Sequence, residues 1–396
     1  MLDRALKFRV SAPGKVILHG EHSVVYGKPA LAGPINLRTY FYCKAIDKPC
    51  FEINYQNLEY ECVITLDNLN LFLKEVNCFN DLEPPMFLYK LREKRDFIYK
   101  YVTHEKPVDK ICSSIEMAVG VTLYLLNRIL KSEGIEVVTK GCKIDINSEI
   151  SIGAGLGSSA SYGVCISAGC YVISQLLKGT VDGKSINEFA FDEKLLTKIS
   201  KWAFDSEVIM HEKPSGIDNT IATYGDIIKF CKGQEPEKIH LKRPVNIMIV
   251  DTAISRSTSR LVAHVAKLQE TFPSTLNSIF DAMGNCVDDA VKVLAAEDDE
   301  EYEKLASLFT INNNLLRAID VSHPALEKIF TIAELHGFKA KLTGAGGGGC
   351  AIILLPSDYL ELNNYANLCD DLTKQHFSWK KTIIGGDGVQ FKMIPE

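Results

Sequence analysis

Residues 151–160 read Ser151-Ile-Gly-Ala-Gly-Leu-Gly-Ser-Ser-Ala160, and this glycine-rich stretch decides how its neighbours fold. Before it, apolar and polar residues alternate over residues 142–147, which predicts a strand with one face toward solvent. After it, residues 160–177 are mostly small or apolar and contain no proline, which predicts a buried helix that begins at the two serines. A loop between a strand and a helix start presents backbone N–H groups at the positive end of the helix. This arrangement favours a bound phosphate.

Two familiar phosphate-binding motifs differ from this loop. A Walker loop requires a lysine at its end, and no lysine follows Gly157. A dinucleotide fingerprint requires a third glycine where this chain has Ser158. The simplest alternative is a tight turn that lets a helix pack on a sheet. Phosphate binding is favoured over that turn because three alternate glycines and two serines stand at the helix start: Gly153, Gly155, Gly157, Ser158 and Ser159.

The composition is that of a globular protein with more than one domain. The chain has 396 residues, too many for one hydrophobic core of ordinary size, so two domains are predicted. Hydrophobic residues make up 46% and charged residues 24%, which is usual for soluble domains. The formal net charge is -6 and there is no large basic block. This balance argues against nucleic acid or an anionic membrane as the main partner.

The cysteines and the chain ends bear on the cellular compartment. The 12 cysteines are scattered without a C-x-x-C pair, which predicts reduced and mostly buried thiols. The N-terminus has too few apolar residues for a secretory signal, and no run reaches 18 apolar residues. The last four residues, Met-Ile-Pro-Glu396, are not a peroxisomal Ser-Lys-Leu tail. We therefore expect a cytoplasmic protein, and a peroxisomal pool stays compatible with the sequence.

The N-terminal segment contains one lysine in an unusual place. Residues 8–18 read as a strand that is broken by Pro13-Gly14 and then resumes, and Lys15 lies in that break. A lone lysine is usually solvated on a surface. Turn formers and apolar strand residues surround this one, which favours an inward side chain, and an inward ammonium requires an anionic partner.

The next tract, Leu18-His-Gly-Glu-His-Ser-Val-Val-Tyr-Gly27, is predicted to be a loop because glycines bound it. Its two histidines are three residues apart, whereas the zinc-protease motif requires a spacing of four on a helix. Glu21 and His22 therefore have two open interpretations. They make local hydrogen bonds in a polar loop, or they line a pocket for a hydroxylated substrate.

Three further segments give the outline of the N-terminal half. Residues 31–42 and 51–64 are predicted to be strands of a mostly antiparallel sheet. Residues 112–131 carry an apolar stripe at helical spacing and are predicted to form a helix. The highly charged residues 91–110 are predicted to be a solvated loop or helix face.

Asp192 can cap a helix that runs to about Met210, with its apolar residues facing inward: Leu195, Leu196, Ile199, Trp202, Ala203 and Phe204. Glu207 lies near the end of that helix, where a free carboxylate opposes the helix dipole. A bound cation or basic partner would relieve this conflict. The ordinary alternative is an exposed helical glutamate.

The tract Pro214-Ser-Gly-Ile-Asp-Asn219 follows. Ser215 can cap a short helix and would place Asp218 at its third position. There the aspartate either accepts backbone N–H groups or acts as a general base whose ionised form is held by the helix start and a lysine. The two interpretations stay open on these residues alone.

Charge and turn residues at 231–244 predict a domain boundary, and residues 245–250 predict the next strand. Arg256 follows that strand, where it suits a planar anion such as a carboxylate or is simply a surface arginine. Two helices are predicted over residues 258–317. The acidic run at 297–303 is predicted to be a solvated face and not a metal site.

Strands are predicted at residues 338–342 and 350–355, with a loop of five glycines between them at 343–349. Glycine loses the most conformational entropy on ordering, so a hairpin alone would not require so many. The excess favours a backbone that closes on a bulky anion, and a mobile lid is the alternative.

These motifs together resemble the GHMP kinases. The resemblance rests on Pro13-Gly14-Lys15-Val16, on Gly153-Ala-Gly-Leu-Gly-Ser-Ser159 and on Lys341-Leu-Thr-Gly-Ala-Gly-Gly-Gly-Gly349, in the order and spread of that family across nearly the whole chain. Residues 18–27, 214–219 and 251–258 are similar to the branch that phosphorylates mevalonate. A galactokinase would read Arg-Val-Asn-Leu-Ile-Gly-Glu-His where this chain has Lys-Val-Ile-Leu-His-Gly-Glu-His. One departure is Ser151-Ile152, where the family often has proline.

The resemblance implies a two-domain α+β fold with the active site between the domains. It implies a ribosomal S5-like N-terminal domain, placed here at residues 1–230, and a ferredoxin-like C-terminal domain at residues 231–396. The implied reaction is transfer of the γ-phosphate of ATP to the C5 hydroxyl of (R)-mevalonate, which gives 5-phosphomevalonate for isoprenoid synthesis.

The resemblance also implies roles for single residues. Asp218 takes the proton from the attacking hydroxyl, and Lys15 lies between Asp218 and the γ-phosphate. Ser159 and Glu207 hold Mg²⁺. Mevalonate is assigned to Glu21, His22, Arg256 and Thr258. ATP is assigned to Lys15, Ser148, Gly153, Ala154, Gly155, Leu156, Gly157, Ser158, Ser159, Gly344 and Gly346.

Two rival functions stay open beside this one. The first is a kinase of the same family for another small alcohol, such as a sugar, which the Gly-Glu-His tract disfavours. The second is an inactive nucleotide-binding sensor, which would be expected to lose Lys15, Glu207 or Asp218, and all three are present. The family further implies a homodimer and inhibition by prenyl diphosphates that compete with ATP.

Overall fold

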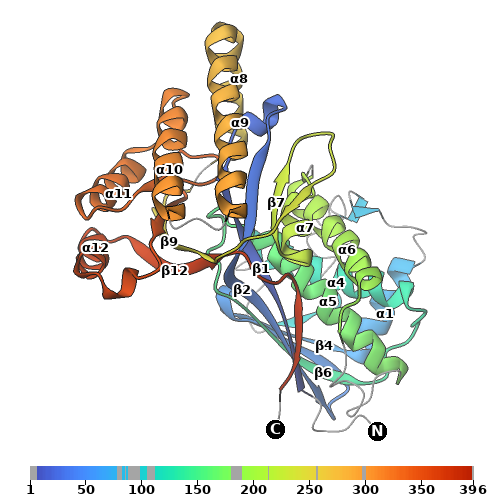
Figure 1. The fold of residues 1–396 in the computed structure, drawn as a ribbon. Coiled ribbons are helices and arrows are strands. Elements are labelled where there is room, and N and C mark those ends of the chain that lie inside the picture. The colour runs from blue at the N-terminus through green and yellow to red at the C-terminus, as the bar shows by residue number, and fades with distance from the viewer. Residues whose placement is uncertain are drawn as a thin grey trace.

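The computed structural model describes residues 7–77, 83–84, 86–87, 99–104, 112–179, 190–212, 214–255, 257–296 and 300–394. In this part of the chain, 13 strands join into one sheet whose main path runs β10-β11-β9-β12-β2-β6-β3-β4-β5. In Figure 1 the N-terminal half, coloured from blue to yellow-green, lies on the right of the view, and the orange and red C-terminal half lies on the left. Both chain ends lie at the bottom of that view.

The N-terminal half is built on a long antiparallel pair, β1 (Lys7–His19) and β2 (Ala30–Ile46). Strand β2 continues to β6 (Gly141–Ser148), which pairs in parallel with β3 (Cys50–Tyr55). A hairpin then adds β4 (Tyr60–Thr65), and β5 (Thr103–His104) follows. The predicted strands at 31–42 and 51–64 are confirmed, the second as the hairpin β3–β4 around the 3-10 turn η2 (Gln56–Leu58). The predicted break at Pro13-Gly14 is wrong, because β1 passes through it with a shift of register against β2.

Helices cover the sheet of this half. They are α1 (Leu66–Asn77), α4 (Ser113–Ser132), α5 (Ser158–Lys178), α6 (Glu193–His211) and α7 (Ile217–Tyr224). The predicted helices at 112–131 and 160–177 are confirmed, and so is the Asp192 cap, whose carboxylate accepts the Leu195 N–H at 2.8 Å. Phe204 does not face inward as predicted and is 37% exposed. The buried stripe of α6 runs through Ile199, Trp202 and Ala203, and Phe204 lies beside that stripe, where its ring covers Gly216.

Helix α5 lies at the centre of this half. It contacts β1, β2, α4, α6 and α7. Among the described residues it is also the one helix long and apolar enough to cross a membrane, although 78% of its apolar window is buried inside the protein. Serines and a glutamine interrupt its sequence, so it contains no uninterrupted run of 18 apolar residues although its mean hydropathy is high. Burial against the sheet explains the composition without a bilayer.

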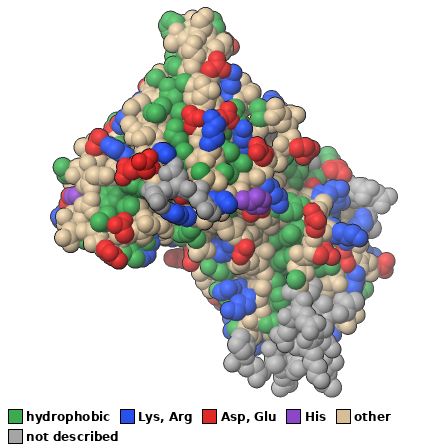
Figure 2. Space-filling model, in the orientation of Figure 1, with side chains coloured by type: hydrophobic (Ala, Val, Ile, Leu, Met, Phe, Trp, Pro, Cys, Tyr) green, Lys and Arg blue, Asp and Glu red, His purple; other side chains and the backbone are tan. Residues whose placement is uncertain are grey.

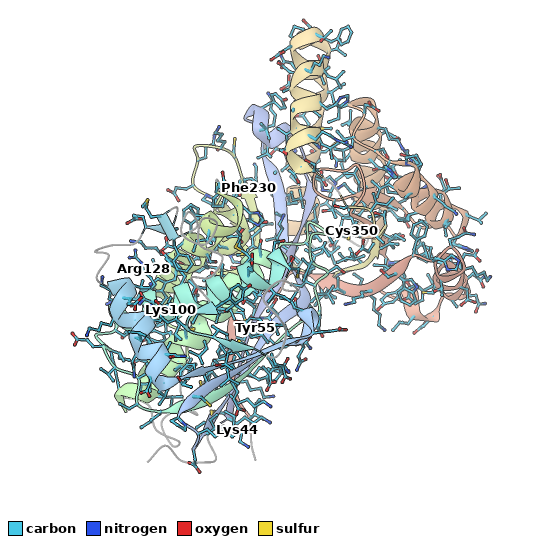
Figure 3. The ribbon with its side chains drawn as sticks, turned by 180° about the vertical axis from the view of Figure 1, so that it is seen from behind. Lys44, Tyr55, Lys100, Arg128, Phe230 and Cys350 are labelled. Atoms are coloured by element: carbon cyan, nitrogen blue, oxygen red, sulfur yellow. The ribbon has the colours of Figure 1, made fainter. Side chains whose placement is uncertain are left out.

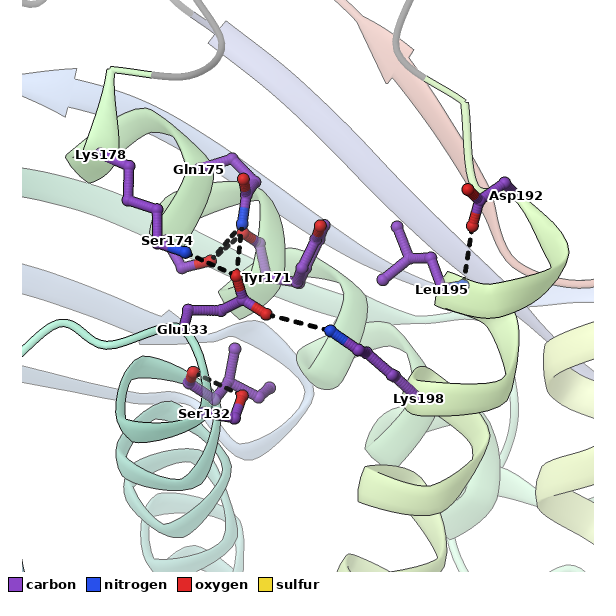
Figure 4. Close-up of polar contacts among 10 residues, drawn as sticks. Ser132, Glu133, Tyr171, Ser174, Gln175, Lys178, Asp192, Leu195 and Lys198 are labelled. Carbon is purple, nitrogen blue, oxygen red and sulfur yellow. Dashed lines mark hydrogen bonds and ion pairs between the residues drawn. The ribbon is translucent and has the colours of Figure 1, made fainter.

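Glu133 ties the ends of three of these helices together (Figure 4). Its carboxylate accepts hydrogen bonds from Lys178 Nζ at 2.7 Å, Gln175 Nε2 at 3.1 Å and Lys198 Nζ at 3.4 Å. These donors come from the last turn of α5 and the second turn of α6, while Glu133 caps the end of α4. The pKa of Glu133 is lowered because these contacts outweigh the effect of burial. The contacts fix the far end of the helical layer relative to the glycine loop.

The C-terminal half has the strand order β12-β9-β11-β10, all antiparallel. Its strands are β9 (Val245–Asp251), β10 (Ala340–Leu342), β11 (Cys350–Leu355) and β12 (Ser378–Ile384). Helices lie between β9 and β10, and α12 (Asn363–Lys374) lies between β11 and β12 after the 3-10 turn η5 (Tyr359–Glu361). This is the ferredoxin-like arrangement that the resemblance implied. The predicted strand at 338–342 begins two residues later than expected, at Ala340.

Strand β11 shows why its sequence is apolar without interruption. All six of its residues are buried. Cys350, Ile352 and Leu354 face one core, and Ala351, Ile353 and Leu355 face another. A strand covered on both faces has no polar side, so the apolar run follows from its central position.

The prediction of two helices over residues 258–317 is wrong, because the described chain has three there. They are α8 (Thr258–Thr271), α9 (Pro273–Ala295) and α10 (Glu301–Ala318), followed by α11 (Pro324–Leu335). Phe272 ends α8 and starts α9, and Pro273 occupies the first helical position of α9. Residues 297–299 of the acidic run lie outside the described residues, and Glu300 is exposed. In Figure 1 the α8–α9 pair forms the column that projects at the top of the molecule.

Strand pairing crosses the predicted boundary at residues 230 and 231. Strand β7 (Ile227–Phe230) pairs with β2, and β8 (Glu237–Ile239) pairs with β7. Near the C-terminus, β13 (Gln390–Met393) returns to pair with β1. The last residues thus complete the N-terminal sheet, and the exact division of the two domains stays a prediction.

Surface charge and cysteines agree with the sequence-based description in the described residues. On the face shown in Figure 2, basic and acidic side chains are interspersed. The described cysteines are free thiols, and most of them are buried. Much of the charged segment 91–110 lies outside the described residues.

Candidate active site

The glycine loop has a left-handed backbone at each of its three alternating glycines. Gly153, Gly155 and Gly157 have φ angles of 76°, 79° and 71°. A side chain at any of these left-handed positions would strain the backbone, so glycine is required at each alternate residue. Gly157 is the N-cap of α5, and no side chain caps that helix end. The first N–H groups of α5 are therefore available to an anion.

Lys15 lies directly under this loop. Its backbone N–H donates to the Leu156 carbonyl oxygen at 2.8 Å. A Cβ atom on Gly157 would lie 2.9 Å from the Lys15 side chain, so glycine lets the lysine pass. The Lys15 side chain is 9% exposed, which confirms that it points inward.

Asp218 is the anionic partner that the buried ammonium requires. Its Oδ2 lies 3.3 Å from Lys15 Nζ, and its side chain is 33% exposed. The two residues are far apart in the sequence, and the packing of α7 against β1 brings them together. The pair therefore joins a shielded cation to a carboxylate that still reaches the open space of a cavity.

The start of α7 differs from the prediction. Gly216, in the left-handed conformation with φ of 80°, is the N-cap instead of Ser215. The Ser215 hydroxyl accepts the Ile217 N–H at 3.4 Å, and Asp218 becomes the second helical residue. Gly216 is the N-cap because few other residues adopt its left-handed φ angle. The ring of Phe204 packs against it.

Glu207 is buried. Its carboxylate is in an unfavourable environment, as its position near the C-terminal end of a helix indicated. The residue is 4% exposed, and Oε1 has no hydrogen-bond partner among the described residues. The pKa of Glu207 is raised to about 7, chiefly by burial and to a smaller extent by the charge of Asp218, while a hydrogen bond from the Ser159 hydroxyl and the charge of Lys15 oppose the shift. An unpartnered carboxylate oxygen in a buried place is costly unless a cation or proton joins it.

His211 was not predicted as a site residue, and the structure places it beside Ser159. Its Nε2 lies 3.0 Å from the Ser159 Oγ. His211 is four residues after Glu207 on α6, so both side chains lie on the face that meets the start of α5. The i, i+4 spacing was a signal that could have identified it.

The donor set around Ser159 fits a magnesium ion that shares a nucleotide phosphate. Mg²⁺ in such sites uses one or two carboxylates together with phosphate oxygens and waters. Glu207 supplies one carboxylate with a spare oxygen, and Ser159 supplies a hydroxyl. In the described chain no group of three or more His, Cys, Asp and Glu residues could hold a metal by itself. A metal here would therefore need ligands from a bound nucleotide.

A cavity of about 770 Å³ adjoins these residues, and Glu207 lies behind Ser159 and His211 and does not itself line it. Lys15, Asp218 and Ser159 line it, together with Ser148 and the three loop glycines. One part of the wall is largely apolar and comes from β3, η2, α4, β6 and α5: Tyr55, Leu58, Met117, Ala118, Ile146 and Tyr162. Tyr55 marks this region near the centre of Figure 3. The size and the apolar wall suit the base and sugar of a nucleotide.

Another part of the wall comes from the segment that contains Glu21 and His22. The chain there is not a simple loop, because η1 (Ser23–Tyr26) follows His22. The His22 Nε2 and the Ala345 carbonyl oxygen lie 2.8 Å apart. The Glu21 side chain is buried, and its carboxylate accepts hydrogen bonds from Lys341 and Asn312. Thr258, at the start of α8, is exposed and completes this wall.

The remaining predicted residues divide into those that reach the cavity and those that do not. Gly344 lines it, whereas Gly346 packs against the Val321 carbonyl oxygen, which a Cβ atom would approach to 2.0 Å. The side chains of Ala154 and Leu156 are buried in the second hydrophobic core, so only their backbone could meet a ligand. Arg256 lies outside the described residues.

The chain is similar to known proteins over nearly its whole length. The family model described as "GHMP kinases N terminal domain" matches residues 116–226, and "GHMP kinases C terminal" matches residues 290–367. A mevalonate kinase of Arabidopsis thaliana is 31% identical over 97% of this chain and 99% of its own length. A mevalonate kinase of Mus musculus is 35% identical over 98% of this chain and 95% of its own. The crystal structure of the Methanococcus jannaschii mevalonate kinase superposes with a TM-score of 0.68 at 25% identity, over 95% of this chain and 98% of that one.

Proposed function

This chain belongs to the mevalonate kinases of the GHMP kinase family, and from that premise we propose that it transfers the γ-phosphate of ATP to the C5 hydroxyl of (R)-mevalonate. The products are 5-phosphomevalonate and ADP. The main observation behind the proposal is the distance of 3.3 Å between Lys15 Nζ and Asp218 Oδ2. Both residues line a cavity that is also lined by the start of α5.

Asp218 is the general base of the proposed reaction. The C5 oxygen forms a bond to the γ-phosphorus, the bond from that phosphorus to the β,γ-bridging oxygen breaks, and the hydroxyl proton passes to the Asp218 carboxylate. The exposed fraction of Asp218 supports this role, because the carboxylate can reach a substrate while Lys15 holds its position. The electron pair of the broken bond leaves with ADP.

Lys15 stabilises charge on both sides of the transferred group. Its ammonium is buried under the glycine loop and contacts Asp218, so it can also meet the γ-phosphate. In phosphoryl transfer the protein acts mainly by positioning the reactants and by neutralising charge. The backbone N–H groups at the start of α5 add to this effect on the phosphates.

Glu207 and Ser159 would hold Mg²⁺ in this site. The support is the spare buried oxygen of Glu207 and its hydrogen bond with Ser159. When bound, the ion screens the negative charge of the phosphates. His211, which contacts Ser159, would orient that hydroxyl.

The two ends of the cavity accept different substrates in this proposal. The apolar wall with Tyr55 and Met117 takes the nucleoside of ATP. The wall with His22 and Thr258 takes mevalonate, whose carboxylate would also meet Arg256. The glycine loop lines the same cavity, so in this proposal the γ-phosphate points from the loop toward the alcohol.

An assay of ADP release with mevalonate, galactose and phosphomevalonate as alternative substrates tests the proposal. We expect turnover with mevalonate and little with the other two. Turnover only with galactose would identify a sugar kinase. Nucleotide binding without turnover of any of the three would identify an inactive sensor.

The family resemblance also supports two properties of the whole protein that need separate measurements. We propose a homodimer, which sedimentation would detect, and competition between prenyl diphosphates and ATP. The large apolar wall supports the second proposal, because it could receive a prenyl chain. Inhibition that does not change with ATP concentration would contradict it.

A further inference from the structure

A fully buried ion pair lies behind the mevalonate end of the cavity. Neither Lys341 nor Glu21 has an exposed side-chain surface. Lys341 Nζ donates to Glu21 Oε1 and, at 2.7 Å, to the Leu342 carbonyl oxygen. Asn312 Nδ2 donates to the other carboxylate oxygen, Oε2, at 3.0 Å. Donors from β10 and α10 thus occupy both oxygens of a residue from the N-terminal segment.

The backbone on either side of Glu21 is constrained. Gly20 has φ of 91°, and a Cβ atom there would lie 2.5 Å from the Pro29 carbonyl oxygen. His22 has φ of 61° and ψ of -48°, which is a strained conformation for a residue with a side chain. Such strain persists only where the surrounding structure holds the residue in place. Glu21, between the two, supplies that hold through its buried side chain.

The same C-terminal segment contacts the N-terminal one at three places. Lys341 binds Glu21, the Thr343 hydroxyl bonds to both the N–H and the carbonyl oxygen of Ile17, and Ala345 accepts from His22. These are alternate residues of the third glycine motif. These contacts fix the third glycine motif against the end of β1. Gly344 and Ala345 of that motif line the cavity.

From these contacts we infer that Lys341 is a positioning residue for the alcohol substrate. It acts through Glu21, which fixes the backbone of residues 20–26 and the imidazole of His22. It also cancels a carboxylate charge beside a pocket that must accept an anion, because mevalonate carries a carboxylate. The inference rests on the proposed function, and it makes Glu21 a link to Lys341 instead of a ligand of mevalonate.

Two single variants and their combination test the inference. Lys341→Met leaves the Glu21 carboxylate unpaired, Glu21→Gln leaves the Lys341 ammonium unpaired, and the double variant has neither charge. We expect each single variant to raise the KM for mevalonate by about 10-fold or more, with a much smaller change in the KM for ATP. The double variant should lie closer to the wild-type protein than either single variant, because no unpaired charge remains.

A different pattern would overturn the inference. If Glu21 binds mevalonate directly, Glu21→Gln and the double variant are equally impaired and Lys341→Met is close to wild type. If Lys341→Met yields no folded protein, Asn312→Ala removes the other donor to the same carboxylate without removing the cation. That variant should raise the KM for mevalonate in the same direction, and an unchanged KM would contradict the inference.

Two controls separate this inference from general instability and from the proposed function. Ile329→Ala truncates a fully buried side chain in the third core and should lower stability without changing the KM for mevalonate. Turnover of mevalonate by the wild-type protein is measured first, because its absence would reject the proposed function itself. Normal wild-type turnover with an unchanged KM in every variant would reject only the role of Lys341.

Discussion

Two of the lysine–carboxylate pairs in the described part of the chain, Lys15–Asp218 and Lys341–Glu21, differ in how far their side chains are exposed. In the first pair, Lys15 is 9% exposed and Asp218 is 33% exposed, and both line the cavity. In the second pair, Lys341 and Glu21 have no exposed side-chain surface. A carboxylate that must take a proton from a substrate has to reach the cavity. A carboxylate that fixes a loop serves best when solvent cannot compete for its hydrogen bonds.

This difference in exposure also predicts which pair affects activity and which affects stability. Water already solvates Asp218, so loss of its partner leaves no fully buried charge. Loss of either member of the second pair leaves an ion in a dry interior. Burial alone raises the pKa of Glu21 and lowers the pKa of Lys341, and the attraction between the two charges opposes both shifts. We therefore expect the first pair to control turnover and the second to control folding and substrate position.

The largest expected effect is on turnover at the first pair. Asp218→Asn should lower kcat by at least about 10²-fold, because a general base contributes that much or more. The substitution keeps the shape of the side chain, so binding of ATP should be largely unchanged. Initial rates and a nucleotide titration would measure the two effects.

Asp226→Asn is a matched control for that substitution. Asp226 follows the other end of α7, where it pairs with Lys238 at 3.5 Å on the surface. Its replacement should leave turnover near the wild-type value. Near-normal turnover of Asp218→Asn as well would remove Asp218 from the role of base.

The second effect is on the stability of the second pair. Lys341→Met should lower the free energy of unfolding by about 3–5 kcal/mol, because it leaves a buried carboxylate without its cation. Urea denaturation would measure the loss. Lys339→Met is the control, since Lys339 pairs with Glu334 at 3.2 Å on the surface and such pairs contribute about 1 kcal/mol or less. Equal losses in the two variants would contradict the distinction between buried and exposed pairs.

A third, intermediate effect concerns Glu207 and magnesium. A metal ligand must be ionised, so a proton competes with Mg²⁺ at a carboxyl whose pKa is raised to about 7. The affinity for Mg²⁺ should therefore be weaker at about pH 6 than at about pH 8, as magnesium titrations of the turnover rate would show. Glu207→Gln should raise the magnesium requirement by about 10-fold or more and abolish its pH dependence.

The sign of the effect on stability follows from the same carboxyl. Its pKa is higher in the folded protein than its ordinary value of 4.5, so the folded state binds a proton that the unfolded chain has lost. Without metal, this group favours folding at low pH, and its contribution declines as pH rises from 4.5 to about 7. Glu193→Gln, at the exposed start of α6, is a control that should change neither property. An unchanged magnesium requirement in Glu207→Gln would count against Glu207 as a ligand.

The smallest expected effect is on the stability of the first pair. Lys15→Met should change the free energy of unfolding by about 1 kcal/mol or less, because Asp218 stays in contact with the solvent of the cavity. Turnover should fall strongly in the same protein. Urea denaturation beside the kinetic assay would show the separation, and a loss as large as that of Lys341→Met would contradict it.

Much of the local structure could be predicted from the sequence because it depends on neighbouring residues. The order of strand, glycine loop and helix around Gly153, Gly155 and Gly157 was predicted from local patterns, and the structure has it as β6, the loop and α5. The Asp192 cap and the uninterrupted apolar strand at 350–355 were likewise readable from spacing. Errors arose where a tertiary contact or a single proline decided the outcome, as at Gly216 under Phe204 and at Pro273 between two helices.

The candidate site could be predicted only in part. Lys15 and Glu207 stood out because each was in an unfavourable place for an isolated charge, and Asp218 stood out through its position at a predicted helix start. The family resemblance connected the three. The partner of Glu21 could not be predicted, because Lys341 is 320 residues away and nothing in either segment indicates the pairing. His211 had a helical spacing from Glu207 but no other signal.

The sequence by itself determined the elements and the chemistry available to them: the glycine loop before a helix, the strands of each half and the ionisable residues next to turns. Only the tertiary structure decided which charged side chains pair, which of them stay exposed to solvent and which are buried. The physical reason is that backbone preference and hydrophobic periodicity act over a few residues, whereas burial of a charge depends on segments that approach one another only when the chain is folded.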